Sequence, residues 1–262
     1  MKINGPYYSD TLLNIILSES VRWTEGVPHI SQILDTSFDG GQEFQKKGCI
    51  GICERVAAGQ IDVTLVQAVL LLSVQEGGKG NRTHAWLYGG LAFRMLDELG
   101  ISIDGHQYAG FEDLTEEDAE TRNRVFWSCY FWDKTLALLI GRTPYVRHTS
   151  VSLPRLLDND VLETEEWYPH GISLPEGMQY PPTPAYKTTC FINMCVLSKI
   201  LNEVLMHIYA PDLEKTEIGF YTCIREQAIN LTNFWEELPD YLKLVPGKLP
   251  LYCPPTNIVL LK

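Results

Sequence analysis

The fold is decided by two neighbouring stretches, HAWLYGGLAFRMLDELGISIDG at residues 84–105 and ETRNRVFWSCYFWDKTLALLIGRTPYVRHTSVSLP at residues 120–154. Apolar residues recur at helical spacing in both stretches, which predicts two helices. The polar, acidic segment between them predicts a loop. Gly100 and Gly141 follow the apolar runs, and glycine readily adopts the left-handed conformation that ends a helix.

The second of these helices has a clear start signal. Thr115 is a typical N-cap residue, and Asp118 follows it at the spacing of a capping box. The acidic residues at 116–118 suit the positive end of the helix dipole. Pro144 cannot continue the helix. We therefore expect a helix over residues 115–140, and from 125 to 140 it is apolar on nearly all sides, which predicts burial there.

Two adjacent glycines, Gly89 and Gly90, lie inside the first helix, which we expect over residues 83–99. A glycine in a helix interior costs about 1 kcal/mol relative to alanine. We therefore expect both glycines to permit the close approach of another helix.

The remaining chain also predicts an all-α fold. Alternating apolar and polar runs, which are typical of strands, are short and rare. Further helices are expected over residues 10–20, 40–58, 62–76, 185–209 and 217–238, with another helix start at residue 256.

We expect one irregular multi-helix domain over residues 1–262. Its core signature is expected at 83–154, a long Pro-rich connection at 168–184, and a second helical part at 185–240. The chain ends just after the helix start at Thr256, so we expect the domain to be truncated at its C-terminus.

The charge balance opposes direct binding of nucleic acid. The formal net charge is -12, whereas a phosphate-binding surface needs clustered Lys and Arg. The longest apolar candidate for a membrane span, residues 63–74, is interrupted by polar residues. The N-terminus lacks the apolar core of a signal peptide. We therefore expect a soluble intracellular protein without membrane contact.

The chain has seven cysteines, an odd number that indicates reduced thiols. Cys49 and Cys53 could share a helix face and bind a metal with a histidine. A structural zinc site needs four ligands, so we favour free thiols and expect no cofactor. The Gly-rich residues 77–80 lack the rest of a phosphate-binding loop and are interpreted as a helix–helix connection.

Signals of catalysis are weak. A helical enzyme of the terpene-synthase type needs an Asp-rich metal motif within a helix, whereas the acidic residues here fall at a loop and a helix start. The chain contains no Gly-x-Ser-x-Gly motif, and its histidines form no acid–base constellation. We therefore predict no catalytic residues and keep a helical enzyme only as a remote alternative.

The order of these signals resembles the regulatory middle homology domain of fungal zinc-cluster transcription factors, in particular activators of the xylanolytic type. Shared features are an Ala-Trp pair, glycines in and after the first helix, Glu and Arg residues before an aromatic pair, an Asp before a basic residue, and Gly-Arg before a proline. The matching residues are Ala85, Trp86, Gly90, Gly100, Glu120, Arg122, Arg124, Phe126, Trp127, Asp133, Gly141, Arg142 and Pro144. Asn123 and Thr143 depart from the family pattern.

The resemblance implies a nuclear, helical domain that regulates RNA polymerase II transcription, through inducer sensing or through inhibition within the molecule or by a partner. The zinc cluster of this family needs six closely spaced cysteines, which this chain does not supply. Zinc and DNA contact are therefore expected only through a separate segment of full-length relatives. The alternative is a stand-alone interaction protein that pairs with itself or restrains full-length relatives.

The arginines of the signature have two interpretations. Arg124 and Arg142 could contact an anionic inducer. They could equally pair with nearby carboxylates, as the i,i+4 spacing of Glu120 and Arg124 suggests. The aromatic cluster around Trp127 could line a pocket, although such clusters more often belong to a core. We favour the structural interpretation for both groups.

Overall fold

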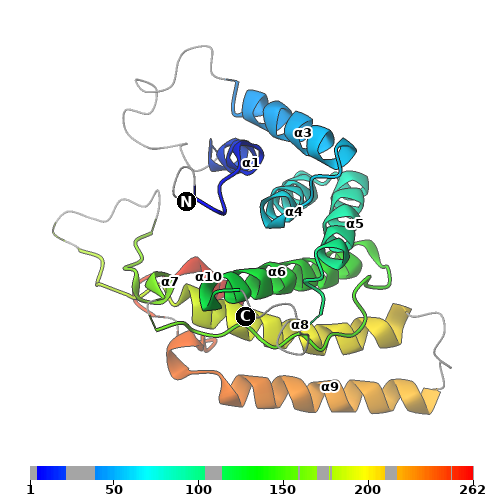
Figure 1. The fold of residues 1–262 in the computed structure, drawn as a ribbon. Helices are drawn as coiled ribbons and strands as arrows, with labels where there is room; N and C mark the ends of the chain where they lie inside the picture. Colours follow the sequence, from blue (N-terminus) through cyan, green and yellow to red (C-terminus); the bar gives the residue numbers. More distant parts are fainter. Residues whose placement is uncertain are drawn as a thin grey trace. The chain divides into compact units, whose positions relative to one another are not determined.

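The computed structural model describes residues 5–21, 39–103, 114–158, 160–169, 177, 179–209, 217–248 and 250–261. In chain order its elements are α1 (Asp10–Ser20), α3 (Gln42–Ala57), α4 (Val63–Gly78), α5 (Arg82–Glu98), α6 (Glu116–Ile140), α7 (Val161–Thr164), α8 (Lys187–Tyr209), α9 (Glu217–Glu237), the 3-10 helix η3 (Asp240–Leu242) and α10 (Thr256–Leu260) (Figure 1). Within these ranges the only β-type pairing is an isolated bridge between Glu166 and Pro184. The all-α prediction is confirmed.

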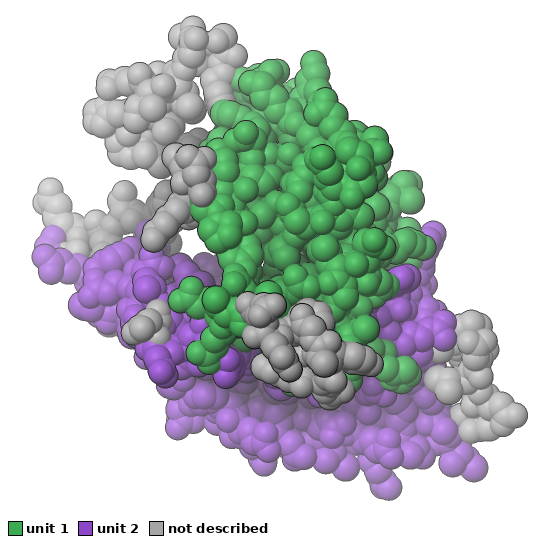
Figure 2. All heavy atoms as spheres, in the orientation of Figure 1, with its two compact units in different colours: residues 1–136, 148–152 green, residues 137–147, 153–262 purple. Residues whose placement is uncertain are grey.

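The chain divides into two compact units, shown in two colours in Figure 2. Unit 1 comprises residues 1–136 and 148–152, and unit 2 comprises residues 137–147 and 153–262. The boundary falls inside α6, which therefore contributes residues to both units. A single domain over the whole chain stays a prediction.

The local start and stop signals act as the sequence predicts. The side chain of Asp62 accepts a hydrogen bond from the backbone N–H of Leu65 (2.9 Å), and Thr115 Oγ1 accepts one from the N–H of Asp118 (3.1 Å). Gly100 and Gly141 adopt φ angles of +63° and +71°. These residues satisfy backbone groups that a helix leaves without intrahelical partners at its ends.

In unit 1, α4 is the most deeply buried helix. Its apolar side chains Leu65, Val66, Val69 and Leu72 are all buried. It packs against α1, α3 and α5. Since neighbours lie on several of its sides, α4 is apolar around most of its circumference rather than along one stripe.

The two adjacent glycines of α5 differ in their surroundings. A Cβ atom built on Gly89 would lie 2.8 Å from Leu136 Cδ1 and 3.2 Å from Ser73 Oγ. The predicted close approach is therefore confirmed at Gly89. At Gly90 a Cβ would meet only Arg94 of the same helix, at 3.5 Å, so the prediction is wrong for Gly90.

Unit 2 is organised around α8, which packs against α7, α9 and α10. Buried Cys190 of α8 joins Leu238, Leu242, Ile258 and Leu261 in one apolar cluster. The helix start expected at residue 256 is confirmed, because α10 begins there and contributes Ile258.

The connection before α8 contains a short helix that the sequence did not predict. Asp160 and Glu163, at α7, accept hydrogen bonds from the first turn of α8. Thr188 Oγ1 donates to Asp160 Oδ2 (2.8 Å), and the backbone N–H of Thr189 donates to Glu163 Oε2 (2.9 Å). The carboxylates therefore cap α8, where the helix dipole favours negative charge. Part of the Pro-rich connection, residues 170–176 and 178, lies outside the described residues.

Helix α8 corrects one sequence interpretation. At 23 residues it is long and apolar enough to cross a membrane by length and composition, whereas we had found no such stretch. Its polar residues Thr188, Ser198 and Asn202 are buried, and the helix packs against the other helices of unit 2. A core helix of a globular protein passes the same test. The absence of membrane contact stays a prediction.

The two glycines of α5 provide a matched pair for measurement. We expect Gly89→Ala to lower the free energy of unfolding by about 1–3 kcal/mol, because the added methyl group overpacks a core that contains buried Leu136. Gly90→Ala should instead be neutral or stabilising by up to about 1 kcal/mol, from helix propensity alone. Urea unfolding of both variants measures the difference. Equal stability of the two would contradict the close packing at Gly89.

Candidate functional site

The aromatic pair of the family signature lies in the core of unit 1. Phe126 and Trp127 are buried, with ring centroids 5.6 Å apart in an edge-to-face arrangement. Tyr130 lies 5.0 Å from the Trp127 ring. The indole N–H of Trp127 donates to the carbonyl oxygen of Ser152 at 2.7 Å. These side chains pack on one another, and the only polar group of Trp127 is satisfied within the unit.

The arginines of α6 are held by neighbouring groups. Arg124 Nε donates to buried Glu120 Oε1 at 2.8 Å, the i,i+4 pair that the sequence predicts. Arg122 Nη2 donates to the carbonyl oxygen of Leu99 at 2.7 Å, at the C-terminal end of α5. A guanidinium group near the last carbonyls of a helix also favours the negative end of its dipole.

The other signature residues have varied surroundings. Ala85 is buried on α5, Trp86 is half-buried, and Gly100 ends α5. The last residues of the signature belong to unit 2, where Gly141 ends α6, Arg142 is exposed and Pro144 is buried. The two candidate ligand contacts, Arg124 and Arg142, therefore belong to different units. Their role as ligand contacts stays a prediction.

A fully buried ion pair lies on α6. Lys134 Nζ donates to Asp133 Oδ2 at 2.8 Å, and both side chains are 0% exposed. The ammonium group also lies 4.0 Å from the centroid of the Tyr130 ring, a cation–π contact. Sequence reasoning noted the adjacent acid and base but not their burial. Removal of charged groups from water is costly unless they are paired, so this pair constrains how α6 packs.

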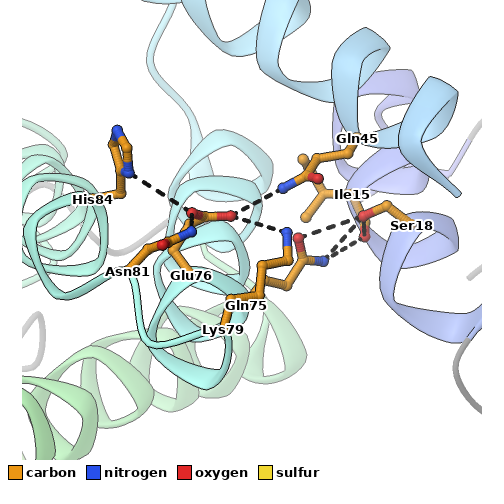
Figure 3. Close-up of polar contacts among 8 residues, drawn as sticks. All are labelled: Ile15, Ser18, Gln45, Gln75, Glu76, Lys79, Asn81 and His84. Atoms are coloured by element: carbon orange, nitrogen blue, oxygen red, sulfur yellow. Dashed lines mark hydrogen bonds and ion pairs between the residues drawn. The ribbon is translucent and has the colours of Figure 1, made fainter.

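Helix α4 carries a polar network at its C-terminal end, shown in Figure 3. The carboxylate of buried Glu76 accepts hydrogen bonds from Asn81 (2.7 Å), Lys79 (3.0 Å) and Gln45 (3.1 Å). His84 Nδ1 lies 3.9 Å from the same carboxylate. One side chain thus joins α3, α4 and α5. Burial by itself would raise the pKa of Glu76, but the hydrogen bonds and the charge of Lys79 outweigh it and hold this pKa below the ordinary value.

The neighbouring residues of α4 extend the network to other helices. Gln75 Nε2 donates to the carbonyl oxygen of Ile15 (3.0 Å) and to Ser18 Oγ (3.1 Å), both on α1. Ser73 Oγ donates to the carbonyl oxygen of Ala85 (2.6 Å) and accepts from Trp132 Nε1 (2.7 Å). The sequence analysis did not predict that these polar residues connect helices. The run Ser-Val-Gln-Glu inside an otherwise apolar helix could have indicated buried polar contacts.

An open groove of about 190 Å³ lies between α1 and α4. It is mainly apolar and is lined by Ile15, Ile16, Glu19, Ser20, Leu71, Val74 and Gln75. Pockets for drug-sized ligands typically enclose about 300–1,000 Å³. The groove is therefore too small to enclose such a ligand.

The thiols lie on α3, α6, α8 and α9 and in the segment before α10. Cys129, Cys190 and Cys195 are buried, and burial raises the pKa of Cys190 to about 11. In the part of the chain that the structure describes, no three side chains of His, Cys, Asp or Glu are placed to hold a metal ion. The seven cysteines lack the close spacing of the zinc cluster found in this class of regulators. Gly77 and Gly78 are the last residues of α4, and residues 79–81 connect it to α5, with Lys79 paired to Glu76.

Comparison with known proteins identifies the class of protein to which this chain is related. The fungal specific transcription factor domain matches residues 53–237. The chain belongs to this family. The matched range includes the buried ion pair of α6, and it begins within α3 and ends with the last residue of α9. The resemblance found in the sequence is thereby confirmed, and the chain is a regulatory domain of a fungal transcription factor.

Three curated relatives show the same relationship. The nitrogen assimilation transcription factor nirA of Emericella nidulans is 28% identical over 95% of this chain. The nitrogen assimilation transcription factor nit-4 of Neurospora crassa is 26% identical over 72% of the chain, and the activatory protein CHA4 of Saccharomyces cerevisiae is 28% identical over 69%. The chain spans only 28%, 17% and 27% of the lengths of these relatives. No solved structure matches it significantly.

The charge on Glu76 should contribute measurably to stability. Because its pKa is lowered in the folded state, its contribution is complete above the ordinary value of 4.5 and is lost as the pH falls through the folded-state pKa. We expect Glu76→Gln to lower the free energy of unfolding by about 1–3 kcal/mol at pH 7. The difference from the wild type should narrow below pH 4.5. Denaturant unfolding at several pH values measures both effects.

The control for Glu76 is Glu43→Gln. Glu43 pairs with Lys47 at 3.5 Å, but both side chains are exposed. Exposed pairs contribute about 0–1 kcal/mol, so this variant should resemble the wild type. If the two variants lose equal stability, the network around Glu76 does not have the role we assign to it.

Trp127→Ala should destabilise unit 1 by about 3–5 kcal/mol, since it empties a large buried volume and leaves the carbonyl of Ser152 without its donor. Arg142→Ala, at an exposed position, should cost less than about 1 kcal/mol. Thermal melting followed by circular dichroism compares the two. An unchanged melting midpoint for Trp127→Ala would contradict its place in the core.

Proposed function

We propose that this chain is the regulatory segment of a longer transcription factor that acts in the nucleus. It works through changes in helix packing and in partner contacts rather than through catalysis. The family membership supports this proposal, as do the relatives, which are transcription factors or activators. Contact with DNA, and the zinc cluster that makes it, would come from a separate segment of the longer protein. The acidic charge of this chain, -12, fits that division of labour.

The observation that carries the proposal is the buried ion pair between Asp133 and Lys134. A buried pair contributes little net stability, because the cost of desolvation cancels most of the attraction. Replacement by apolar residues of similar size is often neutral or stabilising. A pair that adds little stability still restricts α6 to arrangements in which both charges remain partnered. We infer that it selects between packing states.

The position of the pair fits such a switch. Asp133 and Lys134 lie a few residues before the boundary between the units, and α6 continues past that boundary to Ile140. A change in packing around the pair therefore acts on a helix that both units share. An anionic inducer could produce this change at exposed Arg142, eight residues after Lys134. A protein partner could produce it by binding either unit.

The proposal can be tested in a reporter assay. The chain would be placed between a heterologous DNA-binding domain and an activating segment. We expect lower reporter expression than with a flexible linker of equal length, because the folded chain restrains its neighbours. The double variant Asp133→Leu with Lys134→Met should retain the fold but shift expression toward one extreme, because the charged constraint is gone.

The matched control is the surface pair of Lys187 and Glu165. These side chains are 2.7 Å apart but about half exposed. Glu165→Leu with Lys187→Met should leave reporter expression as in the unaltered fusion. Protein amounts are checked by immunoblot. Expression equal to that of the linker fusion, at equal protein amounts, would refute the regulatory role. Equal effects of the two double variants would refute the role of the buried pair.

A further inference from the structure

Two thiols lie one helical turn apart on α3. Cys49 is half-buried and Cys53 is exposed, and both belong to the continuous helix Gln42–Ala57. Residues four positions apart lie on the same side of a helix, about 40° from each other around its axis. The pair therefore presents two soft sulfur ligands toward the same part of the surface of unit 1.

A different side of α3 is packed closely against α1. A Cβ atom built on Gly48 would lie 2.5 Å from Ile15 Cδ1, and one built on Gly51 would lie 2.5 Å from Thr11 Oγ1. The two glycines thus permit close contact with α1, which Figure 1 shows beside α3. The two thiols lie about 100–160° around the helix axis from these glycines. Their spacing is therefore set by a packed helix and not by a loop.

The surroundings of the thiols do not favour a reactive cysteine. Burial raises the pKa of Cys49, and the nearby Cys53 and Glu76 raise it further, while Lys79 acts in the opposite direction. Tyr88 of α5 also has a raised pKa, caused first by burial and then by the charges of the two thiols and Glu76. A thiol with a raised pKa stays protonated at neutral pH. Cys49 is therefore poorly suited to act as a nucleophile or as a sensor of oxidation.

The spacing of the two thiols suits a bridging atom better than a direct bond. Cβ atoms four residues apart on a helix are about 5–6 Å from each other, whereas a disulfide needs roughly 3.5–4.5 Å. Two metal–sulfur bonds of about 2.3 Å, the length in zinc thiolates, span about 4.6 Å when they are collinear. Each sulfur lies one bond beyond its Cβ atom, so side-chain rotation brings the two sulfurs to that separation without unwinding α3.

The number of available ligands selects the kind of ion. Among the residues that the structure describes, no three side chains of His, Cys, Asp or Glu are grouped to hold a metal. Structural zinc sites take four protein ligands and catalytic ones take three, so this pair does not fit zinc. Thiolates are soft ligands that favour monovalent copper. A soft monovalent ion of this kind is satisfied by two thiolates in line.

We propose that Cys49 and Cys53 form a binding site for a soft monovalent cation of the copper(I) type, held between their two sulfurs. Each thiol loses one proton on binding and no electron is transferred, so the complex carries one negative charge. The nearby pair of Glu76 and Lys79 has no net charge and does not oppose this. Gln45, one turn before Cys49, donates to Glu76, so the site adjoins the polar network at the end of α4. The proposal does not rest on the switch in α6.

Binding is measured without oxygen, by titration of the reduced 262-residue chain with copper(I) in competition with bicinchoninate, a chromogenic chelator of copper(I). We expect the chain to withdraw one copper ion from the chelator. Cys49→Ser and Cys53→Ser should each raise the dissociation constant at least tenfold, because each leaves a single thiolate. Both variants should keep the metal-free melting midpoint of the wild type within a few degrees. A wild-type chain that withdraws no copper would overturn the proposal.

The matched control is Cys223→Ser with Cys253→Ser. This double variant also removes one half-buried and one exposed thiol, but from other parts of the chain. It should leave the dissociation constant for copper unchanged. A loss equal to that of Cys49→Ser would assign the copper to scattered thiols and would overturn the site on α3.

The double variant Cys53→Ser with Glu54→Cys tests the geometry. It keeps the number of thiols but moves the second one from about 40° to about 140° around the helix axis from Cys49. Residue 54 is exposed, as residue 53 is, so the change should not disturb the fold. We expect copper binding to weaken as much as in Cys53→Ser. Binding as tight as in the wild type would show that the spacing on α3 does not hold the ion.

X-ray absorption of the copper-loaded wild-type chain counts the ligands. We expect two sulfur neighbours for each copper ion. Three or more neighbours, or nitrogen in place of sulfur, would overturn the assignment of a site made by these two thiols alone.

Discussion

Helix α4 brings polar side chains into the core of unit 1, and each of them must find a partner on a neighbouring helix. Gln75 bonds to α1, Glu76 receives hydrogen bonds from α3 and from the turn before α5, and Ser73 joins α5 to α6. A buried polar group without a partner costs about 1–3 kcal/mol, so a displacement of any one helix would leave several groups unsatisfied. The apolar side chains of α4 supply the driving force for burial, and the polar groups fix the register of the helices around it.

Buried polar groups of α6 also need partners. Lys134 and Asp133 are wholly buried, yet they lie on a helix whose other buried residues are mostly apolar, among them the aromatic Phe126, Trp127 and Tyr130. The ammonium group is held by a carboxylate and by the ring of Tyr130. An apolar pair would fill this space with little or no loss of stability, so the charges restrict the packing of α6 more than they strengthen it. This combination is suited to a regulatory domain, in which the choice between arrangements matters more than the total free energy of folding.

The core of unit 2 is built from segments that lie far apart in the sequence. Its core consists of α8 and of segments that follow it by many residues, including η3 and α10. The side chain of Asn257, in α10, donates to the carbonyl oxygen of Ala185 at 2.8 Å, just before α8. Helix α9 contributes mainly half-buried side chains to this unit and leaves several large apolar residues in solvent. The apolar side chains of α9 are therefore less buried than those of α4 in unit 1.

The sequence by itself determined the long helices and the family, but not the short helices α7 and η3. Helix ends depend on residues only a few positions away, so local signals are sufficient to predict them. Examples are the caps at Asp62 and Thr115 and the glycines at the ends of α5 and α6. The tertiary structure alone decided which buried polar groups meet. Gln75 and Ile15 are 60 positions apart, and Ser73 and Trp132 are 59 apart. The tertiary structure also decided that Gly89 is closely packed and Gly90 is not, and that Lys134 is buried. These outcomes depend on neighbouring helices that no local sequence pattern specifies.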